Sequence, residues 1–202
     1  MIKIEIPPHV RGLVFDCDGT IADTMPAHYR AWVEALGEHD IEFPEAMFYE
    51  MGGIPAPRIV EILNERHAHD LPVMQTAMYK ESLFERLIPE IMPIEPIVNI
   101  VREYHGTLPM AVATGGFRHI VEKTLDVLQI RGKFQAIVCA EDVRHGKPAP
   151  DVFLEAARRL GIDPALCMAF EDATPGIQAA TAAGMRVVDV RPFAAQGRAA
   201  QK

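Results

Sequence analysis

Five short apolar runs recur along the chain, and each is followed directly by polar residues or glycine. Between later runs, apolar positions fall at helical spacing, as in residues 117–129 and 151–160, which predicts an amphipathic helix in each place. Buried strands that alternate with such helices are typical of a parallel sheet covered on its faces by helices. The pattern therefore predicts an α/β fold with a doubly wound, Rossmann-like parallel sheet. The predicted strands are residues 12–15, 110–113, 136–139, 167–170 and 187–190.

A long insertion separates the first predicted strand from the second. It spans about ninety residues, far more than one crossover helix requires, and its apolar pattern is helical between glycines and prolines. We therefore expect two domains, an α/β catalytic core of residues 1–24 and 93–202 and a small helical cap of residues 25–92. The helices expected in the cap are residues 26–36, 57–66 and 74–87.

Composition and charge mainly exclude certain classes of protein. With 49% apolar and 24% charged residues, the 202-residue chain has the composition of a globular protein. Lys and Arg number 20 against 28 Asp and Glu, a net charge of −8, and nucleic acids or anionic membranes are usually bound through basic surfaces. We expect neither partner. The longest stretch without formal charge, residues 104–117, is also too short for a membrane helix.

The cysteines and the N-terminus favour a reducing, cytoplasmic location. Cys17, Cys139 and Cys167 cannot all pair within one chain. The first residues lack the basic start and unbroken apolar run of a secretory signal. Nothing in the pattern indicates an extended apolar surface for self-association, so we expect a monomer.

Two aspartates one residue apart, Asp16 and Asp18, directly follow the first predicted strand. A strand that ends in an Asp-Gly turn explains them poorly, because two neighbouring carboxylates repel each other and gain nothing structurally. A cation between them would reverse that cost. For Asp23 and Thr24, just downstream, capping of the next helix is as good an explanation as a catalytic role.

A second acidic pair, Glu171 and Asp172, ends the fourth predicted strand. In doubly wound sheets the ligand site lies at the carboxyl ends of the strands, which would bring the two acidic pairs together. Carboxylate oxygens suit Mg²⁺, whereas the histidine or thiolate ligands that zinc prefers are missing from these positions. We therefore expect a Mg²⁺ site at this edge of the sheet.

Two further strand ends carry groups suited to an anion. Thr114 and Gly115 offer a hydroxyl and unobstructed N–H groups before a predicted helix, and Lys147 follows the third strand in a proline-rich turn. Each signal is weak alone, because a plain turn or a surface lysine explains it nearly as well. Their combination with the acidic pairs indicates a site for a phosphorylated ligand.

In chain order these residues resemble the four motifs of the haloacid dehalogenase-like phosphohydrolase superfamily. The matching motifs are Asp16-x-Asp18-Gly19-Thr20-x-x-Asp23, Thr114-Gly115, Lys147-Pro148 and Glu171-Asp172. The helical insertion after the first motif is similar to the cap of the beta-phosphoglucomutase-like branch. Within that branch the chain resembles bacterial sugar phosphatases, including those that act on fructose 1-phosphate and on 6-phosphogluconate.

The resemblance implies a role for each motif residue. Asp16 would attack phosphorus and form an aspartyl-phosphate, and Asp18 would protonate the leaving oxygen and later deprotonate water. Thr114 and the Gly115 N–H would hold the transferring oxygens, and Lys147 would neutralise charge. The implied Mg²⁺ ligands are Asp16, the backbone carbonyl of Asp18, Glu171 and Asp172.

The same resemblance implies that the cap closes over a small phosphorylated sugar or sugar acid and helps to select it. Residues 23–26 and 87–93 would be the hinges. His28, in the first cap helix, would lie near the sugar, although a packing role within the cap explains it equally well. Gly53 would contact the substrate through its backbone.

Other functions stay open at this stage. A mutase of the beta-phosphoglucomutase type would hold a second phosphate with an arginine and with polar side chains, where this chain has Ala56 and Gly116. Dehalogenases of the superfamily lack the second acid, which is Asp18 here. A protein that binds sugar phosphates without turnover would keep the cap and lose the nucleophile. The sequence therefore favours hydrolysis of a small sugar phosphate.

Overall fold

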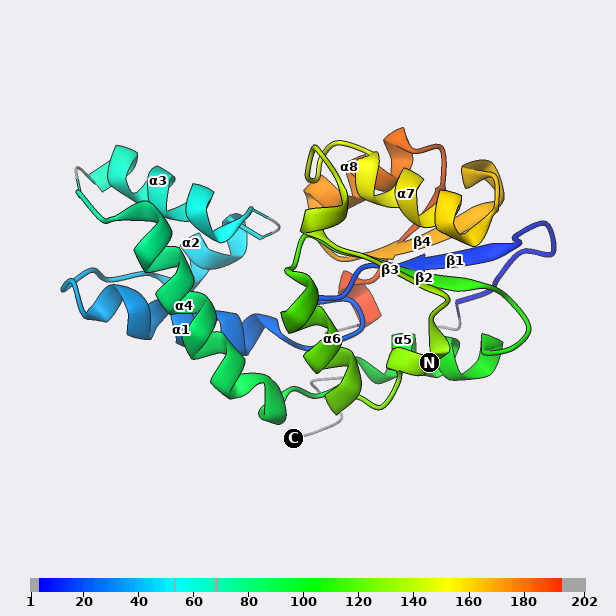
Figure 1. Ribbon diagram of the computed structural model, residues 1–202, viewed down its shortest axis with the longest axis horizontal. Coiled ribbons are helices and arrows are strands. Elements are labelled where there is room, and N and C mark those ends of the chain that lie inside the picture. Colours follow the sequence, from blue (N-terminus) through cyan, green and yellow to red (C-terminus); the bar gives the residue numbers. More distant parts are fainter. Residues whose placement is uncertain (1–3, 53, 68, 194–202) are drawn as a thin grey trace. The chain divides into compact units, whose positions relative to one another are not determined.

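The computed structural model describes residues 4–52, 54–67 and 69–193 (Figure 1). These residues divide into two compact units. The core unit contains the described residues up to Asp23 and from Met92 onward, and the cap unit is Thr24–Ile91.

A five-stranded parallel sheet forms the centre of the core unit, which confirms the predicted fold class. Its spatial order is β3-β2-β1-β4-β5, so the strand order reverses between β1 and β4. The strands are β1 (Gly12–Phe15), β2 (Met110–Ala113), β3 (Ala136–Val138), β4 (Cys167–Glu171) and β5 (Arg186–Asp189).

Four of the predicted strand boundaries, on β3, β4 and β5, differ from the structure by one residue. Cys139 was expected to end β3, but its N–H donates to the Asp142 carboxylate and it begins a 3₁₀ turn instead. β4 continues to Glu171 because this residue still pairs with Asp189 of β5. The charged side chain of Glu171 therefore does not end the pairing between β4 and β5.

Four helices cover the sheet, with α7 and α8 on one face and α5 and α6 on the other (Figure 1). The apolar stripe of α7 buries Val152 and Phe153 against the sheet, as the helical spacing predicted. α5 and α8 were not among the predicted elements. The bounds are α5 (Glu95–Tyr104), α6 (Arg118–Val127), α7 (Asp151–Leu160) and α8 (Thr174–Ala182), with 3₁₀ turns η2 (Arg131–Lys133), η3 (Ala140–Asp142) and η4 (Pro164–Leu166).

All regular elements described in the cap unit are helices or 3₁₀ turns. The three expected helices are present, and a fourth, α2, was missed because six residues are too few to display a helical period. Trp32 is 1% exposed and packs in an apolar cluster with Phe43 and Phe48. The elements are α1 (Met25–Gly37), α2 (Glu45–Glu50), α3 (Ala56–His67), α4 (Val73–Leu87) and the 3₁₀ turn η1 (Ile88–Glu90).

The two chain segments that leave and re-enter the core unit are hydrogen-bonded to each other. The Asp23 N–H donates to Met92 O at 2.9 Å, and the Ile94 N–H donates to Ile21 O at 2.8 Å. Thr24 follows as the N-cap of α1, but its buried hydroxyl makes no capping bond and has no hydrogen-bond partner among the described residues. The capping explanation of Thr24 was therefore wrong.

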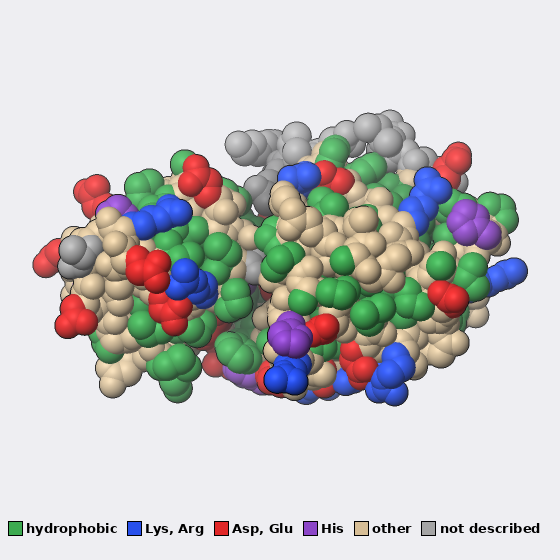
Figure 2. Space-filling view, turned by 90° about the horizontal axis from the view of Figure 1, so that it is seen from above, with side chains coloured by type: hydrophobic (Ala, Val, Ile, Leu, Met, Phe, Trp, Pro, Cys, Tyr) green, Lys and Arg blue, Asp and Glu red, His purple; other side chains and the backbone are tan. Residues whose placement is uncertain are grey.

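Other surface and core features bear on the expected partners. No helix within the described ranges has the length and apolar character needed to cross a bilayer. Lys and Arg side chains are interspersed with carboxylates on the face shown in Figure 2, without a continuous basic patch on that face. Cys17, Cys139 and Cys167 are all buried free thiols.

We predict that Trp32→Ala lowers the free energy of unfolding by about 3–5 kcal/mol, because it empties the centre of the cap cluster. The neighbouring Val33→Ala is the matched control. Val33 lies on the same helix but is 45% exposed, so its loss should change stability by no more than about 0.5 kcal/mol. Urea unfolding followed by far-ultraviolet circular dichroism measures both, and equal effects of the two substitutions would contradict the packing assignment.

Candidate active site

The two acidic pairs meet because β1 and β4 are neighbours in the sheet. Phe15 pairs with Phe170 in register, and the Asp16 N–H donates to Phe170 O at 3.0 Å. The first carboxylate beyond each pair is therefore Asp16 on one strand and Glu171 on the other. The strand order reverses between these two strands, where doubly wound sheets bind ligands at the carboxyl ends.

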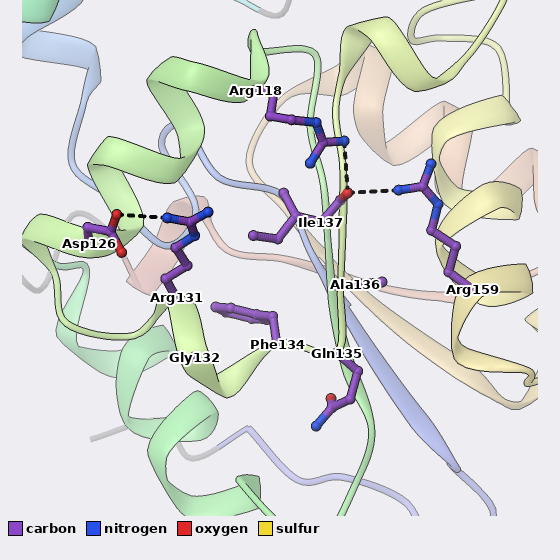
Figure 3. A pocket seen from close by; sticks show the side chains of 9 residues that line it. All are labelled: Arg118, Asp126, Arg131, Gly132, Phe134, Gln135, Ala136, Ile137 and Arg159. Carbon is purple, nitrogen blue, oxygen red and sulfur yellow. Dashed lines mark hydrogen bonds and ion pairs between the residues drawn. The ribbon is translucent and has the colours of Figure 1, made fainter.

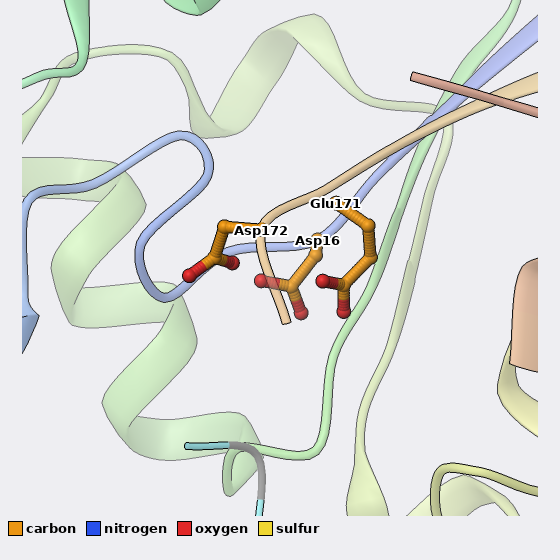
Figure 4. A group of neighbouring side chains, drawn as sticks. All are labelled: Asp16, Glu171 and Asp172. Atoms are coloured by element: carbon orange, nitrogen blue, oxygen red, sulfur yellow. The ribbon is translucent and has the colours of Figure 1, made fainter. Parts of the chain in front are cut away.

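Three carboxylates converge at this point. Asp16, Glu171 and Asp172 offer oxygen atoms that all lie within 4.8 Å of one another (Figure 4). Asp16 is 5% exposed and Glu171 is 1% exposed. Within the described part of the chain, this is the group of acidic and histidine side chains with the geometry to hold a metal ion.

Lys147 bridges two of these carboxylates from the loop after β3. Its Nζ donates to Asp16 Oδ1 at 2.6 Å and to Glu171 Oε1 at 2.7 Å. The same ammonium lies 5.1 Å from the centre of the Phe153 ring on α7. Contacts with two carboxylates raise the pKa of Lys147 despite its burial, so the side chain carries a fixed positive charge.

One ammonium does not balance three carboxylates. Burial is the main cause that raises the pKa of Asp16 well above its ordinary value, although Lys147 opposes it. Burial, then the nearby Glu171, raises the pKa of Asp172 to about 7. A divalent cation would restore the ionised forms, and an all-oxygen donor set suits Mg²⁺. The residues present therefore fit a bound Mg²⁺ ion.

The loop after β1 is shaped to bring Asp172 into this group. Gly19 has a φ of +80°, and a Cβ added there would lie 2.2 Å from Asp172 Oδ2. The Thr20 hydroxyl donates to Asp172 Oδ1 at 3.0 Å. The sequence motif contained Thr20, but only the structure gives the residue a role, which is to orient Asp172.

Asp18 and Thr114 both lie beside Gly116, at the end of the site next to β2. A Cβ added to Gly116 would lie 3.5 Å from both Asp18 Oδ2 and Thr114 Oγ1. Thr114 Oγ1 accepts the Gly116 N–H at 3.1 Å, which leaves the hydroxyl proton available to a ligand oxygen. Among the described residues, apart from its chain neighbours, no atom lies within 4 Å of a Cβ added to Gly115, so its backbone is unobstructed.

The predicted cap residues are in the other unit. His28 lies on α1, where its ring stacks on Phe84 at 3.6 Å between centroids and its Nδ1 is 2.8 Å from Lys80 Nζ. Lys80 is 3% exposed and also contacts Glu81 at 3.0 Å. Both explanations of His28, packing and substrate contact, stay compatible with this arrangement. Gly53 lies outside the described residues.

A cavity elsewhere in the core unit lacks the chemistry of the acidic group. It has a volume of about 720 Å³ and runs along the edge strand β3 (Figure 3). Its arginines are paired internally: Arg118 and Arg159 both donate to Ile137 O, and Arg131 pairs with Asp126. Arg118 and Arg159 also contact the Asp142 carboxylate. This cavity therefore offers little uncompensated charge to a ligand.

Comparison with known proteins identifies relatives over most of the chain. A model of the haloacid dehalogenase-like hydrolases matches residues 10–184. Fructose-1-phosphate phosphatase YqaB of Escherichia coli (strain K12) is 44% identical over 89% of this chain and 96% of its own length. Beta-phosphoglucomutase of Bacillus subtilis (strain 168) is 30% identical over 90% and 83%. The crystal structure of CbbY from Rhodobacter sphaeroides in complex with phosphate matches with a TM-score of 0.79 and 26% identity. The match covers 88% of this chain and 84% of CbbY.

We predict that Mg²⁺ raises the melting temperature of the chain and that the increase is larger at pH 8 than at pH 6. A carboxyl group whose pKa is raised binds a cation well only above that pKa, which is about 7 for Asp172. Asp172→Asn should weaken Mg²⁺ binding by about tenfold or more. Differential scanning fluorimetry and isothermal titration calorimetry measure these effects.

Asp126→Asn provides the control for this experiment, because Asp126 is an exposed carboxylate paired with Arg131 away from the acidic group. It should bind Mg²⁺ as the wild type does. If Mg²⁺ left the melting temperature of the wild-type chain unchanged at both pH values, that result would contradict the cation site.

Proposed function

Because the chain belongs to the haloacid dehalogenase-like hydrolase family and is a sugar phosphatase, we propose that it hydrolyses fructose 1-phosphate with Mg²⁺ as cofactor. The observation that carries this proposal is the convergence of Asp16, Glu171 and Asp172 within 4.8 Å, with the Lys147 ammonium 2.6 Å from Asp16. A nucleophile, a cation site and a fixed positive charge thus lie together at one edge of the sheet.

Asp16 is the proposed nucleophile. One carboxylate oxygen attacks phosphorus, a new P–O bond forms to Asp16, and the bond between phosphorus and the sugar oxygen breaks. Asp18 donates its proton to the departing sugar oxygen, so the sugar leaves as an alcohol. The products of this step are the free sugar and an aspartyl-phosphate on Asp16.

The second step regenerates the enzyme. Asp18, now ionised, takes a proton from a water molecule as that water attacks phosphorus. The bond between phosphorus and Asp16 breaks, inorganic phosphate forms, and Asp18 is again protonated for the next turnover. One residue serves both steps because each step leaves it in the form that the other requires.

Charge neutralisation is the main demand on the site. A carboxylate that approaches a phosphate is repelled by roughly 4 kcal/mol per charge pair at about 4 Å and an effective dielectric of about 20. Lys147 offsets part of this from a fixed position, and Thr114 and the Gly115 N–H hold the transferring oxygens. Bound Mg²⁺, held by Asp16, Asp172, Glu171 and the Asp18 carbonyl, would supply the remaining positive charge.

Support for fructose 1-phosphate comes from the Escherichia coli relative, which is a fructose-1-phosphate phosphatase by name. The relatives described above include no 6-phosphogluconate phosphatase, and we do not propose that substrate. The expected cytoplasmic location and monomeric state stay predictions, as does the contact of His28 and Gly53 with the sugar.

Two positions in the sequence favour hydrolysis over mutase chemistry. A mutase of this type would bind a second phosphate through side chains at positions 56 and 116. This chain has Ala56 and Gly116 there, and neither has a polar side chain. The arginines two residues further along the sequence from each position are paired with carboxylates: Arg58 with Glu61 and Glu65, and Arg118 with Asp142. A second phosphate would therefore find no unpaired arginine at these positions.

We predict that Asp16→Asn lowers phosphate release from fructose 1-phosphate by about 10³-fold or more, because the amide is a far weaker nucleophile. Asp189→Asn is the control, since Asp189 also ends a parallel strand but forms an exposed pair with Arg191. It should retain activity within about twofold. Steady-state phosphate release measures both, with circular dichroism to verify folding, and wild-type activity in a pure Asp16→Asn protein would eliminate this nucleophile.

The substrate and the reaction class are tested together. We predict that phosphate is released from fructose 1-phosphate with Mg²⁺ present and that EDTA abolishes the release. Conversion of glucose 1-phosphate to glucose 6-phosphate without net phosphate release would instead establish a mutase. Binding of fructose 1-phosphate with no turnover of any phosphorylated sugar would establish a binding protein.

A further inference from the structure

Helix α8 contains a glycine that its backbone conformation does not require. Gly176 is the third residue of the helix and is buried. Its φ is not in the left-handed region, where glycine is favoured, unlike that of Gly19 or Gly161. A glycine inside a helix destabilises it by about 0.5–1 kcal/mol relative to alanine. Another demand on this position must therefore outweigh helix stability.

The space beside Gly176 is occupied by the Glu171 carboxylate. A Cβ added to Gly176 would lie 1.6 Å from Glu171 Oε1, 2.1 Å from its carboxyl carbon and 2.8 Å from Oε2. Real Cβ atoms essentially never approach a heavy atom within 3.0 Å, so Oε1 at 1.6 Å would have to retreat by about 1.4 Å. Any side chain at this position would thus displace the carboxylate.

The displaced oxygen is the one that holds Lys147. Glu171 Oε1 accepts the hydrogen bond from Lys147 Nζ at 2.7 Å, and the same Nζ donates to Asp16 Oδ1 at 2.6 Å. Glu171 Oε2 accepts the Ala173 N–H at 2.5 Å, which fixes the carboxylate at the start of α8. A continuous series of contacts therefore connects Gly176 to the proposed nucleophile.

We propose that Gly176 is a positioning residue for phosphoryl transfer, and this inference rests on the proposed function. Its missing side chain leaves the space in which the Glu171 carboxylate lies. Glu171 in turn fixes the Lys147 ammonium beside Asp16. The glycine contacts no substrate atom in this scheme, and its effect on the reaction passes entirely through Glu171 and Lys147.

Gly176→Ala should lower kcat/KM for fructose 1-phosphate by about 10²-fold, mainly through kcat, because a misplacement of about 1 Å removes transition-state stabilisation. The far-ultraviolet circular dichroism spectrum should stay that of the folded chain, since alanine favours the helix. Gly132→Ala is the control, because a Cβ added there meets no atom of the described residues within 4 Å apart from its chain neighbours. It should retain kcat/KM within about twofold.

Rescue separates positioning from a general structural defect. Glu171→Asp shortens the side chain by one methylene and withdraws the carboxylate from the space above Gly176. In that background Gly176→Ala should lower kcat/KM by less than about threefold. An unchanged kcat/KM in Gly176→Ala, or the same loss with and without Glu171→Asp, would overturn the inference.

Crystal structures of the variants test the inference independently of turnover. In Gly176→Ala we expect the Glu171 carboxylate to move and the Lys147 Nζ to lose its hydrogen bond to Glu171 or to Asp16. If Lys147 Nζ kept its hydrogen bonds to both Glu171 and Asp16 in this variant, the inference would be overturned, whatever the activity of the enzyme. If the wild type released no phosphate from fructose 1-phosphate or p-nitrophenyl phosphate, the proposed function would fail, and these structures alone would decide the role of Gly176.

Discussion

The buried ion pair of Lys147 with Asp16 and Glu171 is the interaction on which the rest of the site depends. An ammonium and carboxylates removed from water are costly unless each is paired with good geometry. Here the two bonds of 2.6 and 2.7 Å join the loop after β3 to the ends of β1 and β4. The side chain of Lys147 is only 7% exposed, so these partners determine its position. Three separate segments of the chain are thereby held in one arrangement.

The remaining negative charge explains why this arrangement suits phosphate chemistry. Asp172 adds a third carboxylate to the group, and burial alone would favour its protonated form. A divalent cation stabilises the ionised forms, and together with Lys147 it offsets the charge of an incoming phosphate. The carboxylates repel one another without a cation, and with a cation and Lys147 beside them they are suited to binding and transferring a phosphoryl group. Such a site differs from a structural ion pair, which would balance its own charge.

Packing space is the second constraint on the site. Carboxylates from neighbouring strand ends can converge only where the surrounding backbone has no side chains to exclude them. Gly19 admits Asp172 through a positive φ, and Gly176 admits Glu171 in an ordinary helical conformation. In both places a methyl group would occupy the position of a carboxylate oxygen. The site is therefore defined by missing side chains as much as by charged ones.

The sequence by itself determined the layered fold, the helical insertion and the carboxylates at the strand ends. Apolar runs with helical spacing between them leave few arrangements other than a covered parallel sheet, which is why β1 and β2 match their predicted limits. The short helix α2 and the exact strand ends escaped prediction, because they depend on pairing partners and on too few residues to show a period. Only the tertiary structure decided that Lys147 bridges Asp16 and Glu171, that Thr20 orients Asp172, and that Gly176 leaves room for a carboxylate. Each of these contacts joins residues that are distant in sequence or depends on available volume, and a linear pattern of residue types contains neither.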